Sequence, residues 1–146
     1  MNLDKFYTKP EIAKQCCDLI DFSKYSSVLE PSAGAGAFLS FLPNNTKAID
    51  LEPDNNKIDK QDFFTYKGTE ELVIGNPPFG RVSSLAVKFF NHAAGFANTI
   101  AFIIPRTFRR VSVQNKLDLN FHLVEDIEIP MGSFIPESMK AKCCFQ

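Results

Sequence analysis

The sequence has no tryptophan, no apolar run long enough to cross a membrane, and no large excess of charge of either sign. The net charge is −1 at pH 7 over 146 residues. The chain therefore lacks the global basic field that gathers nucleic acid, which argues against a stand-alone duplex binder. The N-terminus lacks a signal-peptide pattern. We expect a cytoplasmic (intracellular) protein with one domain over residues 1–146, long enough to bury a core.

Cysteine is scarce, and its spacing is not that of a zinc site. The four cysteines form two adjacent pairs, Cys16 with Cys17 and Cys143 with Cys144, rather than Cys-x-x-Cys ligand pairs. Adjacent cysteines rarely bond to each other, and in an intracellular chain small buried thiols stay reduced. We therefore expect buried, reduced cysteines and no bound metal.

Helical and strand-like segments alternate along the chain. The expected helices cover residues 10–22, where Pro10 is the first helical residue, 36–42, 83–94 and part of 107–117. The expected strands cover residues 26–29, 47–51, 57–60, 71–75, 98–104, 121–129 and 142–146. This alternation predicts an α/β fold with a mostly parallel sheet covered on both faces. Ligands of such sheets bind beyond the carboxyl ends of the strands.

A loop of small residues follows the first buried strand. Gly34 and Gly36 allow a tight turn and a close approach of backbone to a ligand. The loop lacks the third glycine of the dinucleotide fingerprint and the Gly-Lys-Ser/Thr of a P-loop. Asp50, at the end of the next strand, is placed to accept hydrogen bonds from two ribose hydroxyls. Asp62 and Phe63 offer an acceptor for an adenine amine and a ring that could flank the base.

The segment Asn76-Pro77-Pro78-Phe79 ends another apolar strand. Two prolines fix their φ angles and remove two backbone donors, so the segment forms a stiff corner. It presents one amide side chain, carbonyls without a local N–H partner, and one aromatic face. These groups can stack on a planar base and accept hydrogen bonds from its exocyclic amine, which predicts group transfer to an amino group.

Taken in order, these motifs resemble the N6-adenine DNA methyltransferases, and in particular their gamma class, whose cofactor motifs precede the catalytic motif. The matching segments are residues 7–10, 29–39, 50–53, 62–63 and 74–80. Residues 100–106 and 143–146 are similar to small phage- and virus-type members. The resemblance covers nearly the whole chain. It implies a Rossmann-like class I methyltransferase fold, with a mostly parallel seven-stranded sheet flanked by helices.

The resemblance also implies S-adenosylmethionine as the cofactor and a role for each matching residue, without a metal. The catalytic corner would comprise Asn76, Pro77, Pro78 and Phe79: Asn76 and the Pro77 carbonyl would accept hydrogen bonds from the target amine, and Phe79 would stack on the flipped base. The cofactor-binding residues would be Tyr7, Thr8 and Pro10 beside the methionine, Glu30, Pro31, Ala33, Gly34 and Gly36 around it, Asp50 at the ribose, and Leu51, Asp62 and Phe63 at the adenine, with Asn76 next to them.

The chain departs from the family in having no separate target-recognition domain. Specificity would then come from short loops or from a partner subunit that recognises the target. Arg106, Arg109 and Arg110 follow a strand on the expected active-site edge and could contact phosphates of DNA or RNA. A solvated helix start explains the same three residues equally well.

Three alternatives to DNA adenine methylation stay open. A relative that methylates adenine or guanine in RNA also carries Asn-Pro-Pro-Phe. Methyltransferases of protein glutamine side chains resemble the pattern but generally have tyrosine at its last position. A catalytically idle scaffold subunit is the third alternative, although the intact corner argues against it.

Overall fold

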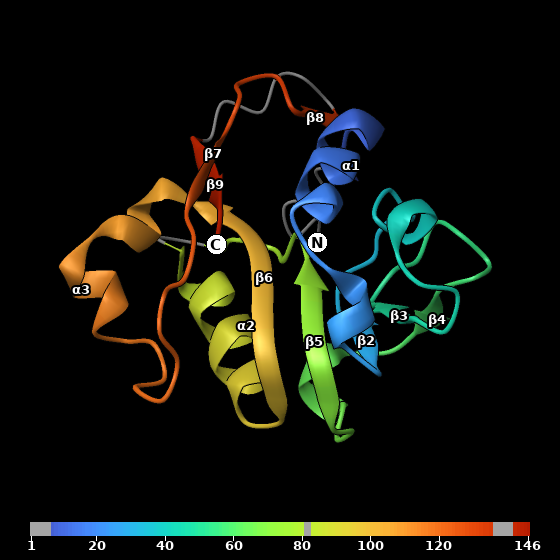
Figure 1. The fold of residues 1–146 in the computed structure, drawn as a ribbon, viewed down its shortest axis with the longest axis horizontal. Helices are drawn as coiled ribbons and strands as arrows, with labels where there is room; N and C mark the ends of the chain where they lie inside the picture. Colours follow the sequence, from blue (N-terminus) through green and yellow to red (C-terminus); the bar gives the residue numbers. More distant parts are fainter. Residues whose placement is uncertain (1–6, 81–82, 136–141) are drawn as a thin grey trace.

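The computed structural model describes residues 7–80, 83–135 and 142–146, and these form a seven-stranded sheet with helices on both faces (Figure 1). The strand order is β4-β3-β2-β5-β6-β9-β7. The strands are β2 (Val28–Glu30), β3 (Lys47–Asp50), β4 (Asp59–Lys60), β5 (Glu70–Gly75), β6 (Ala97–Pro105), β7 (Ile127–Ile129) and β9 (Cys143–Phe145). A separate two-stranded sheet pairs β1 (Tyr7–Thr8) with β8 (Phe134–Ile135).

The five strands from β4 to β6 are parallel, and only β9 runs antiparallel to its two neighbours, β6 and β7. The prediction of a mostly parallel, seven-stranded sheet is therefore confirmed. The central strands are apolar at successive positions because both faces are covered. In β5, for example, Leu72 and Ile74 face one core cluster and Val73 faces the other, and all three side chains have no exposed surface.

The helices divide between the two faces. Helix α1 (Pro10–Asp18) packs its buried residues on the face that holds Leu72, whereas α2 (Ser84–Ala94) and α3 (Val111–Gln114) pack on the opposite face. Short 3₁₀ turns cover Phe22–Lys24, Leu39–Phe41, Phe63–Thr65 and Arg106–Arg109. No helix in the described residues is both long enough and apolar enough to span a membrane.

Two expected helices are shorter than the sequence suggests. The expected helix over 36–42 is only the 3₁₀ turn Leu39–Phe41, because Gly34 and Gly36 have φ angles of +58° and +92° and hold the loop in a different path. The expected helix over 10–22 ends at Asp18. Within 107–117 a 3₁₀ turn leads into the short helix α3.

The expected strand over 121–129 is a strand only at Ile127–Ile129. A strand needs a partner for its backbone groups, and the neighbouring β9 pairs with β7 only from Cys143 to Phe145. The four cysteines are buried and free, as expected. Burial raises the pKa of the Cys16 thiol to about 12, so this group behaves as a small apolar side chain.

Candidate active site

The carboxyl ends of β2, β3 and β5 meet at one edge of the sheet, and the β1 strand lies against this edge. Two contacts locate β1 there. The Tyr7 ring lies 3.1 Å from where a Cβ on Gly34 would be, and the Thr8 side chain bonds to Asn76. The predicted cofactor loop and the predicted catalytic corner are therefore neighbours in space, although 40 positions in the sequence separate Gly36 from Asn76.

Asn76 is held at the end of β5 by two hydrogen bonds. Its side-chain nitrogen Nδ2 donates to Thr8 Oγ1 at 3.1 Å, and its backbone carbonyl accepts from Ser32 Oγ at 3.0 Å. Among the described residues, no donor bonds to Asn76 Oδ1 or to the Pro77 carbonyl. The corner therefore keeps two oxygen acceptors available on neighbouring residues, as group transfer to an amine requires.

The end of the corner is fixed to the start of α2. The Phe79 carbonyl accepts hydrogen bonds from the N–H groups of Leu85 and Ala86, at 3.0 and 3.1 Å. The Phe79 ring is half-buried between the two core clusters. Gly80 has a φ of +73°, and a Cβ there would lie 2.5 Å from the Leu85 Cβ. Only glycine therefore fits at this position.

The Asp50 carboxylate joins the loops after β2 and β3. Its Oδ2 accepts from the Gly34 N–H and its Oδ1 from the Glu52 N–H, both at 2.8 Å. A carboxylate can accept about four hydrogen bonds, so two positions remain for donors of a ligand. Because Asp50 also orders the glycine loop, its substitution by alanine would disturb the loop as well as any ligand.

Glu30 is the buried carboxyl of this edge, with 1% of its surface exposed. Its Oε1 has no hydrogen-bond partner among the described residues. Burial, with a smaller effect from the nearby Asp50 charge, raises the pKa of Glu30 well above its ordinary value of 4.5. An unpartnered buried carboxyl is costly unless a ligand satisfies it, which makes Glu30 the strongest indication of a site for a positively charged group.

The cavity beside Glu30 has a volume of about 30 Å³ and is lined by the loop after β2 with Tyr7, Thr8 and Asn76. This volume holds about one water molecule rather than an amino-acid moiety. Tyr7 forms one wall of the cavity, where its ring packs on Gly34 and its hydroxyl donates to Asp54. A larger ligand would require the side chains around the cavity to rearrange.

The residues predicted to contact a cofactor adenine lie beside Asp50, and one differs from expectation. The exposed Leu51 follows Asp50 directly. Asp62 follows Gln61, whose N–H donates to the Asp50 carbonyl at 2.9 Å. The Asp62 Oδ1 accepts a hydrogen bond from the Phe64 N–H. The Phe63 ring is 1% exposed and packs in the core against Phe89 and His92. Phe63 therefore does not present its ring to a ligand.

Of the remaining predicted cofactor residues, three form the framework of the loop after β2 and one lies in α1. Pro10 is exposed at the first turn of α1, whereas Pro31, Ala33 and Gly36 are buried. The Ala33 N–H bonds to the Ile49 carbonyl at 2.9 Å, which ties the loop after β2 to β3. In the residues that the structure describes there is no group of three potential metal ligands.

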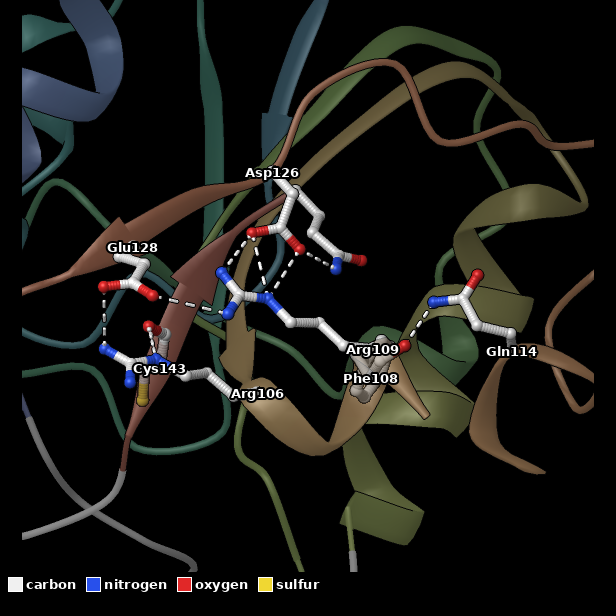
Figure 2. A network of polar contacts seen from close by, with 8 residues as sticks. Arg106, Phe108, Arg109, Gln114, Asp126, Glu128 and Cys143 are labelled. Carbon is white, nitrogen blue, oxygen red and sulfur yellow. Dashed lines mark hydrogen bonds and ion pairs between the residues drawn. The ribbon is translucent and has the colours of Figure 1, made fainter. Parts of the chain in front are cut away.

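The arginines after β6 differ in their partners (Figure 2). Arg109 makes a bidentate contact with Asp126, and Arg106 bonds to the Cys143 carbonyl at 3.2 Å and lies 3.6 Å from Glu128. The hydrogen bonds that Arg109 donates to Asp126 raise the pKa of Arg109 and lower the pKa of Asp126. Arg110 is exposed and has no ion pair with any described residue. Of the three predicted phosphate contacts, Arg110 is thus the one that has no carboxylate partner among the described residues.

Two supporting residues escaped the sequence analysis. Ser32 lies in the matching segment 29–39 but was given no role, and Asp54 lies outside every matching segment. Their partners Asn76 and Tyr7 lie more than 40 positions away. The sequence likewise showed no sign of the hydrogen bond between Thr8 and Asn76, although it indicated each residue separately. Spacing within the sequence carries no signal for such contacts.

Comparison with known proteins gives a sequence match over part of the chain. The type II methyltransferases M.HincII and M.HindII of Haemophilus influenzae are each 33% identical over 95 residues, which is 59% of this chain. The match covers 19% of M.HincII and 18% of M.HindII, so the chain spans about a fifth of the length of these relatives. No family model matches the sequence.

Solved structures match the fold over almost the whole chain. The 23S rRNA methyltransferase ErmE has a TM-score of 0.64 and 16% identity, covering 95% of this chain and 68% of its own. PH1948 of Pyrococcus horikoshii, assigned provisionally as an RNA methyltransferase, has a TM-score of 0.63 and 16% identity, covering 92% and 80%. Together with the strand order, these matches establish that the chain has the Rossmann-like class I methyltransferase fold.

Proposed function

We propose that the protein is an S-adenosylmethionine-dependent methyltransferase that acts on the exocyclic N6 amine of adenine in DNA. The observation that carries this proposal is the geometry of Asn76. Thr8 and Ser32 hold its amide nitrogen and its backbone carbonyl, so that Oδ1 and the Pro77 carbonyl stay available as acceptors. This pair of acceptors lies near the end of β2, where Oε1 of the buried Glu30 has no hydrogen-bond partner among the described residues.

The residues around Glu30 fit the charge of the cofactor. S-adenosylmethionine supplies an electrophilic methyl group on a positively charged sulfur and also carries an ammonium group. The carboxyl groups of Glu30 and Asp50 would favour these positive charges and the ribose hydroxyls. Leu51 and Asp62 would hold the adenine. Because the cavity beside Glu30 has a volume of only about 30 Å³, cofactor binding would require the side chains around it, including Tyr7, to rearrange.

The corner would activate the target amine by accepting its two hydrogens. An exocyclic amine is a poor nucleophile because its lone pair is delocalised into the ring. Hydrogen bonds to Asn76 Oδ1 and to the Pro77 carbonyl would favour a pyramidal nitrogen and stabilise the positive charge that develops on it. The half-buried Phe79 ring would stack on the base once it has left the helix. The rigid prolines, Pro77 and Pro78, keep these acceptors aligned, which supplies part of the rate.

The comparisons support methyl transfer more strongly than they support the choice of nucleic acid. The sequence relatives are type II methyltransferases, which favours DNA modification as the role. A second candidate is methylation of RNA, because the fold is also similar to a 23S rRNA methyltransferase. The proposal includes a separate partner subunit that recognises the target.

Substitution of the corner tests the proposed chemistry. Asn76→Ala removes one acceptor of the target amine and leaves the glycine loop in place. We expect turnover to fall roughly 10²–10³-fold while the affinity for S-adenosylmethionine stays within a few-fold. Asn44→Ala is the matched control, because Asn44 is exposed and makes no hydrogen bond to a described residue. Equal turnover in both variants would remove Asn76 from the mechanism.

A further inference from the structure

Thr8 is a buried residue that belongs to both parts of the candidate active site. It is 4% exposed, and its Oγ1 accepts a hydrogen bond from Asn76 Nδ2 at 3.1 Å. Thr8 and Asn76 both line the cavity beside Glu30. The threonine therefore contacts the proposed catalytic corner and also borders the space proposed for the methionine part of the cofactor.

A second element holds the backbone of Thr8 in place. In the β1–β8 pair Thr8 lies opposite Phe134, and the N–H of the next residue, Lys9, donates to the Ser133 carbonyl at 2.9 Å. Phe134 is 2% exposed and belongs to the core cluster on the face of α1. The branched Cβ of threonine also restricts its χ1 angle. A change in the cavity is therefore expected to redirect the hydroxyl hydrogen of Thr8 rather than to move its oxygen.

The observed orientation of the Asn76 amide requires the Thr8 O–H to point away from it. A hydroxyl has one donor and two acceptor positions, and its O–H rotates. Because Thr8 Oγ1 accepts from Asn76 Nδ2, its own hydrogen must find another acceptor. Among the described residues, none accepts this hydrogen. An acceptor placed in the adjoining cavity would supply the missing partner.

Two groups around the cavity thus call for opposite partners. The buried Glu30 Oε1 lacks a donor among the described residues, and the Thr8 O–H lacks an acceptor among them. The amino-acid part of S-adenosylmethionine carries both kinds of group, an ammonium that donates and a carboxylate that accepts. This end of the cofactor therefore matches both residues at once.

Only the observed orientation of the Asn76 amide suits transfer to an amine. The target amine brings two hydrogens, which Asn76 Oδ1 and the Pro77 carbonyl would accept. If the Thr8 O–H pointed at Asn76, the amide would turn to offer Oδ1 to Thr8 and would set its own N–H groups against those of the target. Ser32 does not decide this choice, because it bonds to the backbone carbonyl of Asn76.

We propose that Thr8 is a positioning residue that couples cofactor binding to the orientation of the Asn76 amide. A carboxylate oxygen of the cofactor accepts the Thr8 O–H, so that Oγ1 acts toward Asn76 Nδ2 only as an acceptor and Oδ1 stays turned to the target amine. This inference rests on the proposed function. By linkage, a target amine bound at Asn76 tightens cofactor binding by the same factor.

NMR of the Asn76 side-chain amide tests this coupling without DNA and without turnover. The two Nδ2 hydrogens are assigned by their loss in Asn76→Ala. The probe is S-adenosylhomocysteine, the demethylated product, and the matched probe is 5′-methylthioadenosine, which lacks the amino-acid part. We expect saturating S-adenosylhomocysteine to slow exchange of these hydrogens with solvent at least ten-fold, and 5′-methylthioadenosine to change it less than about two-fold.

Three threonine variants identify the hydroxyl as the coupling group. Thr8→Val keeps the shape of the side chain without its hydroxyl and should abolish the slowing, whereas Thr8→Ser keeps the hydroxyl and should preserve it. Thr46→Val is the matched control, because the buried Thr46 Oγ1 has no hydrogen-bond partner among the described residues. In methyl transfer, Thr8→Val should lower kcat at least ten-fold with a smaller change in KM, and Thr8→Ser should restore most of kcat.

The outcomes separate this inference from the proposed function. Binding of S-adenosylhomocysteine without slower exchange at Asn76, or equal slowing in Thr8→Val and the unaltered chain, would overturn the coupling and leave methyl transfer in place. Equal slowing by 5′-methylthioadenosine would also overturn it, since the amino-acid part would not be needed. Failure of the unaltered chain to bind S-adenosylhomocysteine would overturn both. If Thr8→Val does not fold, the two probes on the unaltered chain decide.

Discussion

At the scale of single residues, the Glu30 carboxyl is in an environment that a stable fold would avoid. It is buried, one of its oxygens has no partner among the described residues, and the Asp50 carboxylate is nearby. This environment disfavours the ionised form of the carboxyl in the folded chain, and proteins keep such buried carboxyls mainly at functional sites. A positively charged ligand would reverse the balance by favouring the ionised form.

Glu30→Gln should therefore stabilise the unliganded protein as pH rises. The folded-state pKa of Glu30 is raised above 4.5, so the wild-type chain keeps this group's full contribution to stability below pH 4.5 and loses it as pH rises through the folded-state pKa. Glutamine has no such loss. The free energy of unfolding, measured by denaturant titration across this range, should favour the variant increasingly at higher pH. A difference that is independent of pH would contradict the assigned environment of Glu30.

Arg110 and Arg109 differ in a way that nucleic-acid binding can detect. The Arg109 guanidinium is already paired with Asp126, whereas Arg110 has no ion pair with a described residue. Arg110→Gln should lower the slope of log affinity against log salt by about one unit, and Arg109→Gln should leave it nearly unchanged. Filter binding to a DNA duplex at several salt concentrations measures both slopes. Unaltered slopes in the two variants would make Arg110 an ordinary surface residue.

The sequence predicted which residues gather at the candidate site but not how they hold one another. The order of motifs was enough to bring Glu30, Asp50 and Asn76 to one edge, because parallel strands all end there. Phe63 was expected to present its ring and is instead in the core. The sequence of the motif is the same whether the phenylalanine ring is buried in the core or exposed to a ligand. Only the packing of α2 on the sheet decides which way its ring points.

At the scale of elements, the turn from the proline corner into α2 depends on Gly80. Its φ of +73° is unfavourable for other residues, and a Cβ would lie 2.5 Å from the Leu85 Cβ. Gly80→Ala should lower the free energy of unfolding by about 2–4 kcal/mol, from backbone strain together with overpacking. Gly132→Ala is the matched control: its φ is +79°, but nothing lies within 4 Å.

The control variant should therefore lose only the strain contribution, about 1–2 kcal/mol. Denaturant unfolding of the two variants measures the difference, which isolates the packing of α2 against the corner. Equal losses at Gly80 and Gly132 would mean that Leu85 is free to move away.

The alternation of helices and strands could be predicted from the sequence, whereas several boundaries could not. Residues 36–42 have helical spacing, but the backbone of the glycine loop leads them into a 3₁₀ turn. Residues 121–126 have strand-like spacing, but a strand forms only where a neighbour supplies hydrogen bonds. In both cases long-range structure overrides a local preference.

At the scale of the whole molecule, strand order is the property that sequence patterns leave open. The antiparallel insertion of β9 between β6 and β7 is visible only in the structure. This insertion brings Gln146 close to Asp126, so that Gln146 Nε2 donates to Asp126 Oδ2 at 2.6 Å. The candidate active site lies elsewhere, at the carboxyl ends of β2, β3 and β5.

The most direct test of the account is the product of methyl transfer by this chain. The protein is incubated with labelled S-adenosylmethionine and, separately, with adenine-containing DNA, with RNA and with protein, and the digested acceptors are analysed by mass spectrometry. We predict N6-methyladenine in DNA, formed by the wild-type chain and reduced roughly 10²–10³-fold by Asn76→Ala. Methyl groups on RNA or on protein glutamine would contradict the proposed substrate. Tight binding of S-adenosylmethionine without transfer to any acceptor would contradict the enzymatic role itself.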